Sequence, residues 1–134
     1  MSDAAILASI DGLRAHPAYQ AAEALRRGTI GSAAAMARAH PGSDEFRAVV
    51  LLVSTWETIA LMMSAVKKKG PIFGTLPVCH MYRELQAAIE QLGNAVKTDE
   101  LDKLYRDYEA WLKSEGLKAE YVSALCGGLH ARFG

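Results

Sequence analysis

The chain has 134 residues, of which 51% are hydrophobic and 22% are charged, the length and balance of one globular domain with a buried core. Its 15 basic and 15 acidic residues cancel, so the formal net charge at pH 7 is zero. This balance argues against a nucleic-acid binder or a membrane-surface protein that depends on bulk positive charge.

The N-terminus and the cysteines favour an intracellular protein. The first residues contain no basic group ahead of the apolar ones, so no signal peptide is expected. Two cysteines, Cys79 and Cys126, are too few for the disulfide framework of a small secreted domain. We therefore expect reduced thiols and a cytoplasmic location.

Proline and glycine divide the chain into helical segments, and no stretch has the alternating pattern of a strand. Ser2 or Asp3 is expected to cap a first helix that ends near Pro17, and residues 18–27 form a second. Residues 29–40 are rich in alanine. Their small side chains either allow close packing against a neighbouring helix or leave the segment loosely held.

The next segment is the longest and the most apolar. Ser43 is expected to cap a helix that runs to Lys69. Within it, residues 48–66 have the length of a membrane span, with Glu57 as the single charge. An acidic residue at the bilayer centre costs about 2.5 to 3.5 kcal/mol, and serine and threonine dilute the segment further. We interpret it as a buried central helix rather than a membrane span.

Three more helices are expected. Thr75 caps one whose apolar residues recur at helical spacing as far as Val96, and Thr98 caps another that stops at Gly116. A last helix covers residues 117–129.

The elements together predict an all-α fold. Because one segment is apolar on nearly all sides, we expect a small bundle of five to six helices around a long apolar central helix at about 43–69. Residues 1–134 are expected to form a single domain, in which the alanine-rich N-terminal helices of residues 1–40 pack on a helical core formed by residues 43–134.

Glu57 is the residue most open to a functional interpretation, because it lies alone among apolar neighbours. A buried carboxylate must be paired, hydrogen-bonded or protonated. Glu57 can therefore be a core residue bonded to Tyr82, Tyr105, Arg83 or a helix terminus. It can also lie on a narrow exposed strip of the helix, or act as a base or ligand contact.

Other polar motifs are weaker. Lys67, Lys68 and Lys69 form the only run of charge, either a solvated helix end or a contact for an anion or an acidic partner. Cys79 and His80 are adjacent, but neighbouring helical residues point about 100° apart, so we expect ordinary surface or boundary residues rather than a nucleophile and its base. The histidine spacing predicts no metal site.

Residues 53–60 (VSTWETIA) place an aromatic residue before Glu57, and Met81, Tyr82 and Leu85 follow in the next long helix. With these motifs, residues 44–115 resemble a bacterial and viral family of helical proteins with no assigned function. Members often carry an N-terminal membrane anchor that is not expected here, so the resemblance implies no membrane location. It assigns no catalytic residue.

The absence of a catalytic motif, together with an excess of apolar helix surface, favours a non-enzymatic module that binds another protein or a second copy of itself. A phage-encoded inhibitor or a bacterial accessory protein would have this character. No cofactor, metal, nucleic-acid or membrane partner is expected. The alternative is a small-ligand-binding protein or an enzyme that uses Glu57 in a helical pocket.

Overall fold

The computed structural model describes residues 1–28 and 31–116, which contain seven α-helices, one 3-10 helix and no strand. The elements in chain order are α1 (Asp3–Ala15), α2 (Pro17–Arg27), α3 (Ala33–Ala37), α4 (Asp44–Met63), α5 (Gly70–Phe73), α6 (Val78–Leu92), η1 (Gly93–Ala95) and α7 (Asp99–Ser114). The predicted all-α fold is confirmed, and two of its helices, α3 and α5, are about one turn long. The helix predicted over 117–129 and the second cysteine, Cys126, lie outside the described residues.

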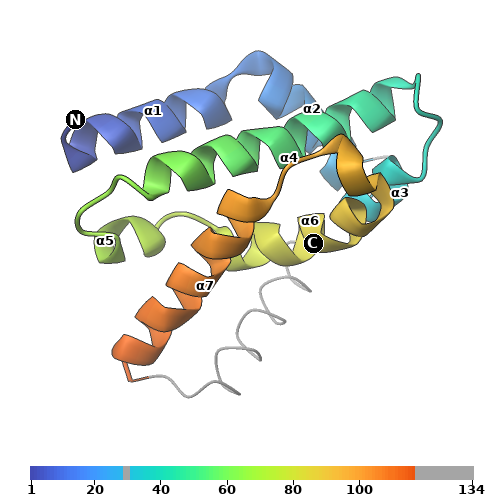
Figure 1. Cartoon of the computed structure of the whole chain (residues 1–134). Coiled ribbons are helices and arrows are strands. Elements are labelled where there is room, and N and C mark those ends of the chain that lie inside the picture. The colour runs from blue at the N-terminus through green and yellow to red at the C-terminus, as the bar shows by residue number, and fades with distance from the viewer. Residues whose placement is uncertain (29–30, 117–134) are drawn as a thin grey trace.

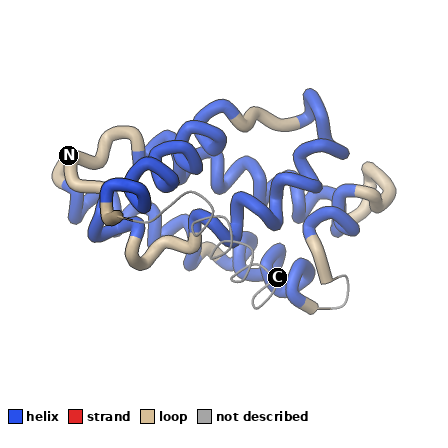
Figure 2. Tube along the Cα trace, turned by 90° about the horizontal axis from the view of Figure 1, so that it is seen from below, coloured by secondary structure: helices blue, strands red, loops and turns tan. Residues whose placement is uncertain are grey.

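The long apolar helix α4 is the central element, as predicted. It contacts α1, α2, α3, α6 and α7; in Figure 1, α1 and α2 lie above it and α6 and α7 below it. Viewed from below in Figure 2, the described chain consists of helices joined by loops. The largest residue of α4, Trp56, is fully buried, and its Nε1 donates a hydrogen bond of 3.0 Å to the hydroxyl of Tyr19 on α2.

The central helix is shorter than the sequence predicted, because it ends at Met63 and not at Lys69. In a continuing helix, the backbone N–H groups of Lys67 and Lys68 would bond to carbonyls one turn earlier. Here they donate to the two carboxylate oxygens of Asp3, at 2.9 and 3.0 Å. A side chain from α1 therefore holds the connection that follows α4.

The predicted serine caps are confirmed; of the two threonine caps, the one at Thr75 is wrong, and the one at Thr98 is correct in position but lacks the side-chain hydrogen bond. The hydroxyls of Ser2 and Ser43 accept hydrogen bonds from the third residue beyond each. Thr75 caps nothing, because α5 and its following turn delay the start of α6 to Val78, and the Thr75 hydroxyl donates to a carbonyl of α5. Thr98 precedes α7 without a side-chain cap bond.

The C-terminal end of α6 was also predicted incorrectly. We expected it to continue to Val96, but α6 stops at Leu92, where Gly93 adopts a φ of +53°. Glycine is the residue that enters this left-handed region at little cost, so it ends the helix before the apolar pattern does.

The alanine-rich segment packs closely. Ser32 caps α3, and both Ala33 and Met36 are fully buried at 0% exposure. The short helix lies against α6 and also touches α4. Of the two alternatives left open for residues 29–40, the closely packed one holds for α3, because small side chains bring its backbone next to α6; residues 29–30 lie outside the described part.

The helix α4 is long and apolar enough to cross a membrane by length and composition. In the fold its inner face is covered by five other helices. We therefore expect the protein, expressed without detergent, to stay in the soluble fraction and to give a strongly helical circular dichroism spectrum. Recovery only in the membrane fraction, or a spectrum dominated by strand, would contradict this arrangement.

Candidate functional site

Glu57 caps the helix α7 from α4. Its Oε1 accepts the backbone N–H of Glu100 at 2.8 Å, and its Oε2 accepts that of Leu101 at 2.9 Å. These N–H groups belong to the first turn of α7, where a helix has unsatisfied donors and favours negative charge. Of the bonding partners predicted for Glu57, the helix terminus is the one observed.

This role leaves Glu57 poorly placed for ligand chemistry. The side chain is half-buried and lines a cavity of about 300 Å³ together with Lys97 and Asp99. Both carboxylate oxygens already hold backbone donors. A ligand in this cavity would have to compete with α7 for the same carboxylate.

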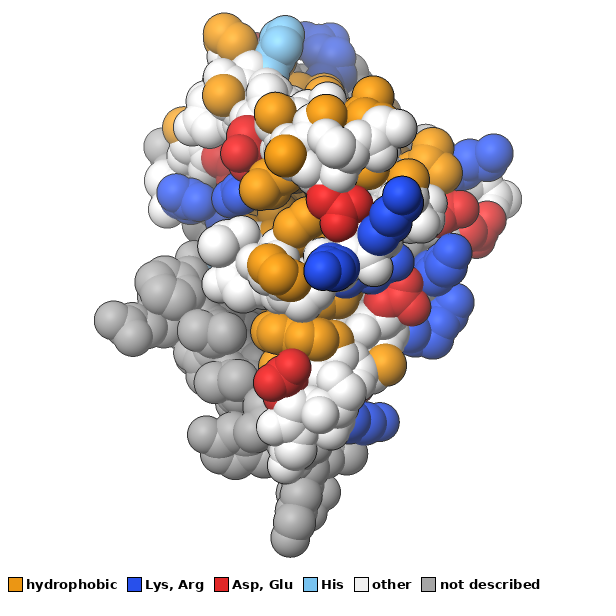
Figure 3. Space-filling model, turned by 90° about the vertical axis from the view of Figure 1, so that its left-hand side faces the viewer, with side chains coloured by type: hydrophobic (Ala, Val, Ile, Leu, Met, Phe, Trp, Pro, Cys, Tyr) orange, Lys and Arg blue, Asp and Glu red, His pale blue; other side chains and the backbone are white. Residues whose placement is uncertain are grey.

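The lysine run lies in the connection between α4 and α5. Lys67 and Lys68 are exposed, and Lys69 donates from Nζ to the carbonyl of Val66 at 3.0 Å. The backbone hydrogen bonds from Lys67 and Lys68 lower the pKa of Asp3. The face of the molecule drawn in Figure 3 carries a mixture of basic, acidic and hydrophobic side chains. The predicted anion or acidic-partner contact stays a prediction.

Cys79 and His80 are buried, so the prediction of surface or boundary residues is wrong. Their exposures are 2% and 7%. The residues Val78 to Met81 are all buried, so little of the first turn of α6 is exposed to solvent. Cys79 is also disulfide-bonded, which corrects the expectation of a reduced thiol at this position. An apolar stripe marks one buried face of a helix and cannot reveal that a second face is covered.

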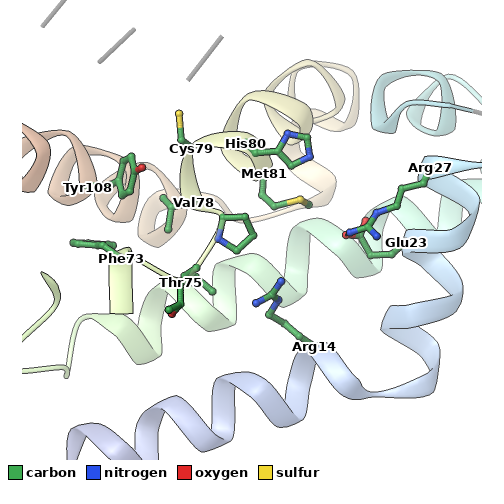
Figure 4. Close-up of a pocket in the computed structure, with 13 residues that line it drawn as sticks. Arg14, Glu23, Arg27, Phe73, Thr75, Val78, Cys79, His80, Met81 and Tyr108 are labelled. Atoms are coloured by element: carbon green, nitrogen blue, oxygen red, sulfur yellow. The ribbon is translucent and has the colours of Figure 1, made fainter. Parts of the chain in front are cut away.

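A cavity of about 620 Å³ lies beside this buried turn (Figure 4). Its apolar side comes from α5, the loop after it, the start of α6 and α7, and its charged side comes from α1 and α2; His80 of α6 also lines it. Among the described residues, the lining consists of Arg14, Glu23, Arg27, Phe73, Gly74, Thr75, Leu76, Pro77, Val78, Cys79, His80, Met81 and Tyr108. The cavity thus combines a mostly apolar wall with a few charged groups.

A buried ionic cluster supports the charged side. Arg26 on α2 has 0% exposure, and its Nε donates to Glu23 Oε2 at 2.6 Å. Its Nη1 lies 3.5 Å from Oε1 of Glu84 on α6, and that same oxygen accepts the backbone N–H of Ala33 at 2.7 Å. Burial alone would lower the pKa of Arg26, but the hydrogen bonds and charges of the two glutamates raise it. The cluster ties α2, α3 and α6 together.

Two positive charges reach the cavity from this side. The Nη2 of Arg27 lies 3.4 Å from Oε1 of Glu23, and its side chain is 65% exposed. The guanidinium of Arg14 lies 5.9 Å from the ring centroid of Trp56 and near the hydroxyl of Tyr19. Burial, followed by the nearby Glu23 carboxylate, raises the pKa of Tyr19, so this hydroxyl is neutral at pH 7.

Sequence reasoning did not identify these residues. The spacing of Glu23 to Arg26 and Arg27 on one helix was a usable signal, because such neighbours can pair. The sequence signal for Glu84 was weaker: this charged residue interrupts the apolar residues around Leu85. Nothing in the sequence marks Arg14, whose neighbours Trp56 and Tyr19 are distant along the chain.

Comparisons of the chain with models of protein families, with curated proteins and with solved structures found no match. The resemblance of residues 44–115 to an uncharacterised helical family therefore stays a prediction. The interpretation of the cavity rests on its geometry and chemistry.

Proposed function

We propose that the protein binds a small, largely apolar molecule in the cavity between α1–α2 and the start of α6. The observation that carries this proposal is a volume of about 620 Å³ with an apolar wall and a few converging polar groups. Ligand sites in proteins commonly have volumes of roughly 300 to 1,000 Å³ and this composition. Small-ligand binding at Glu57 is the alternative function predicted from the sequence. The proposal keeps that function but assigns the ligand contacts to the residues of this cavity, which do not include Glu57.

The apolar wall is suited to such a ligand because its side chains are fixed by packing. The ring of Phe73 packs edge-on to Tyr108, with centroids 5.4 Å apart and an interplanar angle of 85°. Val78 and Met81, in the buried turn of α6, are 1% and 2% exposed. A preformed wall of this kind loses little side-chain entropy when a ligand binds.

Binding of the neutral dye N-phenylnaphthylamine tests the proposal. The dye should fluoresce in the presence of the protein, and Thr75→Trp should weaken its binding by about tenfold or more, because Thr75 lines the cavity. Thr75 is exposed, so the larger side chain can be accommodated without disrupting the core.

Thr58→Trp is the matched control, because Thr58 is an exposed threonine on α4 outside this cavity. It should leave dye binding unchanged. If the dye does not bind, or if both tryptophan variants bind it as the unmodified protein does, the cavity is not a ligand site.

A second candidate function is self-association through α4, in keeping with the predicted interaction module. Leu51 is 36% exposed and Leu61 is 57% exposed. With Ser54 and Thr58, which are also exposed, they form an uncharged strip along the outer side of the helix. Two copies can bring this strip together without opposing like charges.

We expect sedimentation at micromolar concentration to show a dimer, and the double variant Leu51→Lys/Leu61→Lys to shift it to monomer, because facing lysines repel each other. Ala24→Lys, on the exposed face of α2, is the control and should leave the dimer intact. A monomer throughout this concentration range would exclude α4 as a self-association surface.

A further inference from the structure

The charged side of the cavity holds a surplus of positive charge. Arg26 is shared between Glu23 and Glu84, and Arg27 pairs with Glu23. Counted with Arg14, three arginines face two glutamates, which leaves one positive charge. Because Arg26 and Arg27 pair with both glutamates, the surplus positive charge lies on Arg14.

Arg14 is the cation without a carboxylate. No carboxylate of the described residues lies within ion-pair distance of its guanidinium, and its contacts are the neutral groups of Trp56 and Tyr19. Its Nε is buried and has no hydrogen-bond partner there. Buried donors normally find a partner, because a donor removed from water without one costs free energy.

The residue that carries this unsatisfied donor, Arg14, lines the cavity. Figure 4 shows its side chain rising from α1 toward Thr75, on the charged side that also carries Glu23 and Arg27. The apolar wall with Phe73 and Tyr108 lies across the cavity. A molecule that fills the cavity can therefore meet a guanidinium at one end and aromatic and aliphatic side chains at the other.

We infer that the cavity accepts a monocarboxylate with an apolar body, whose carboxylate pairs with Arg14. The planar guanidinium presents Nε–H beside a terminal N–H and so matches the two oxygens of a carboxylate. The pair would neutralise the surplus charge, and a turn of the Arg14 side chain that brings the buried Nε to the cavity would give this donor an acceptor. This inference rests on the proposed function, because it specifies the ligand of the same cavity.

The test compares decanoate with decanol as competitors of the neutral dye, using the full chain at neutral pH. The two differ in the head group and share the apolar chain. Decanoate should displace the dye at a concentration about tenfold or more below that of decanol, as expected for hydrogen bonds to a charged group. Arg14→Met should weaken decanoate by about the same factor and leave decanol within about twofold.

Arg38→Met is the matched control, since Arg38 is an exposed arginine at the end of α3, and it should change neither competitor. Circular dichroism checks that each variant is folded. If Arg14→Met is not folded, Arg14→Lys keeps the charge, removes the planar fork and should retain part of the preference for decanoate.

Two results would overturn the inference, and they differ. If decanoate and decanol compete equally in the unmodified protein, the ligand is not selected by its charge, and the proposed apolar site still stands. If the dye itself does not bind, the proposed function fails and the inference fails with it.

Discussion

Replacing Arg26 with methionine is expected to destabilise the protein by about 3 to 5 kcal/mol, the cost of removing one partner from a buried ion pair. Arg26 is fully buried between Glu23 and Glu84, and both glutamates are more than nine-tenths buried. Methionine has a similar length, so the change removes the charge and donors with little loss of volume. The two carboxylates would then remain buried without their cation. Chemical denaturation measures the change in the free energy of unfolding.

The neighbouring residue supplies the control. Arg27 also pairs with Glu23, but its side chain is 65% exposed, so Arg27→Met should cost less than about 1 kcal/mol. The double variant Arg26→Met/Glu84→Gln should recover part of the loss, because it leaves one buried carboxylate rather than two. If Arg26→Met costs no more than Arg27→Met, the cluster does not hold α2 against α6.

Glu57→Ala should destabilise the protein by about 1 to 3 kcal/mol, because it leaves two backbone donors of α7 without their acceptor. Glu57→Gln should cost less, since its amide oxygen still accepts one of these bonds and both native donors are neutral N–H groups. Denaturation of the three proteins orders them as unmodified, glutamine and alanine from most to least stable.

Glu90→Ala provides the comparison, because Glu90 is an exposed glutamate on α6, and its loss should stay within about 0.5 kcal/mol. Near-neutral stability of Glu57→Ala would show that α7 does not depend on this cap. Loss of partner or ligand binding with unchanged stability would instead restore the functional interpretation of Glu57.

The sequence by itself determined the helices and the central place of α4. A serine followed by a helical pattern predicted the starts of α1 and α4, because a cap and the residues it bonds to lie within one turn. The nearly continuous apolar surface of α4 predicted that other helices cover it. These properties depend on residues that are close together in the sequence, so they can be predicted from the sequence alone. Three predicted helix boundaries were wrong. Asp3 binds the backbone where α4 was expected to continue to Lys69, and the unpredicted helix α5 delays the start expected at Thr75. Gly93 ends α6 before Val96.

Only the tertiary structure decided what the polar residues do. Glu57 could be recognised as a carboxylate in need of a partner, but its donors lie 43 and 44 residues further along the chain. The bond between Glu84 and Ala33 spans 51 residues, and no periodicity encodes such a pairing. The cavity beside Arg14 exists because α1–α2 and the start of α6 approach α4 from different sides. Helical periodicity reports which face of a segment avoids water, whereas a binding site depends on which distant segments meet, and only packing fixes that.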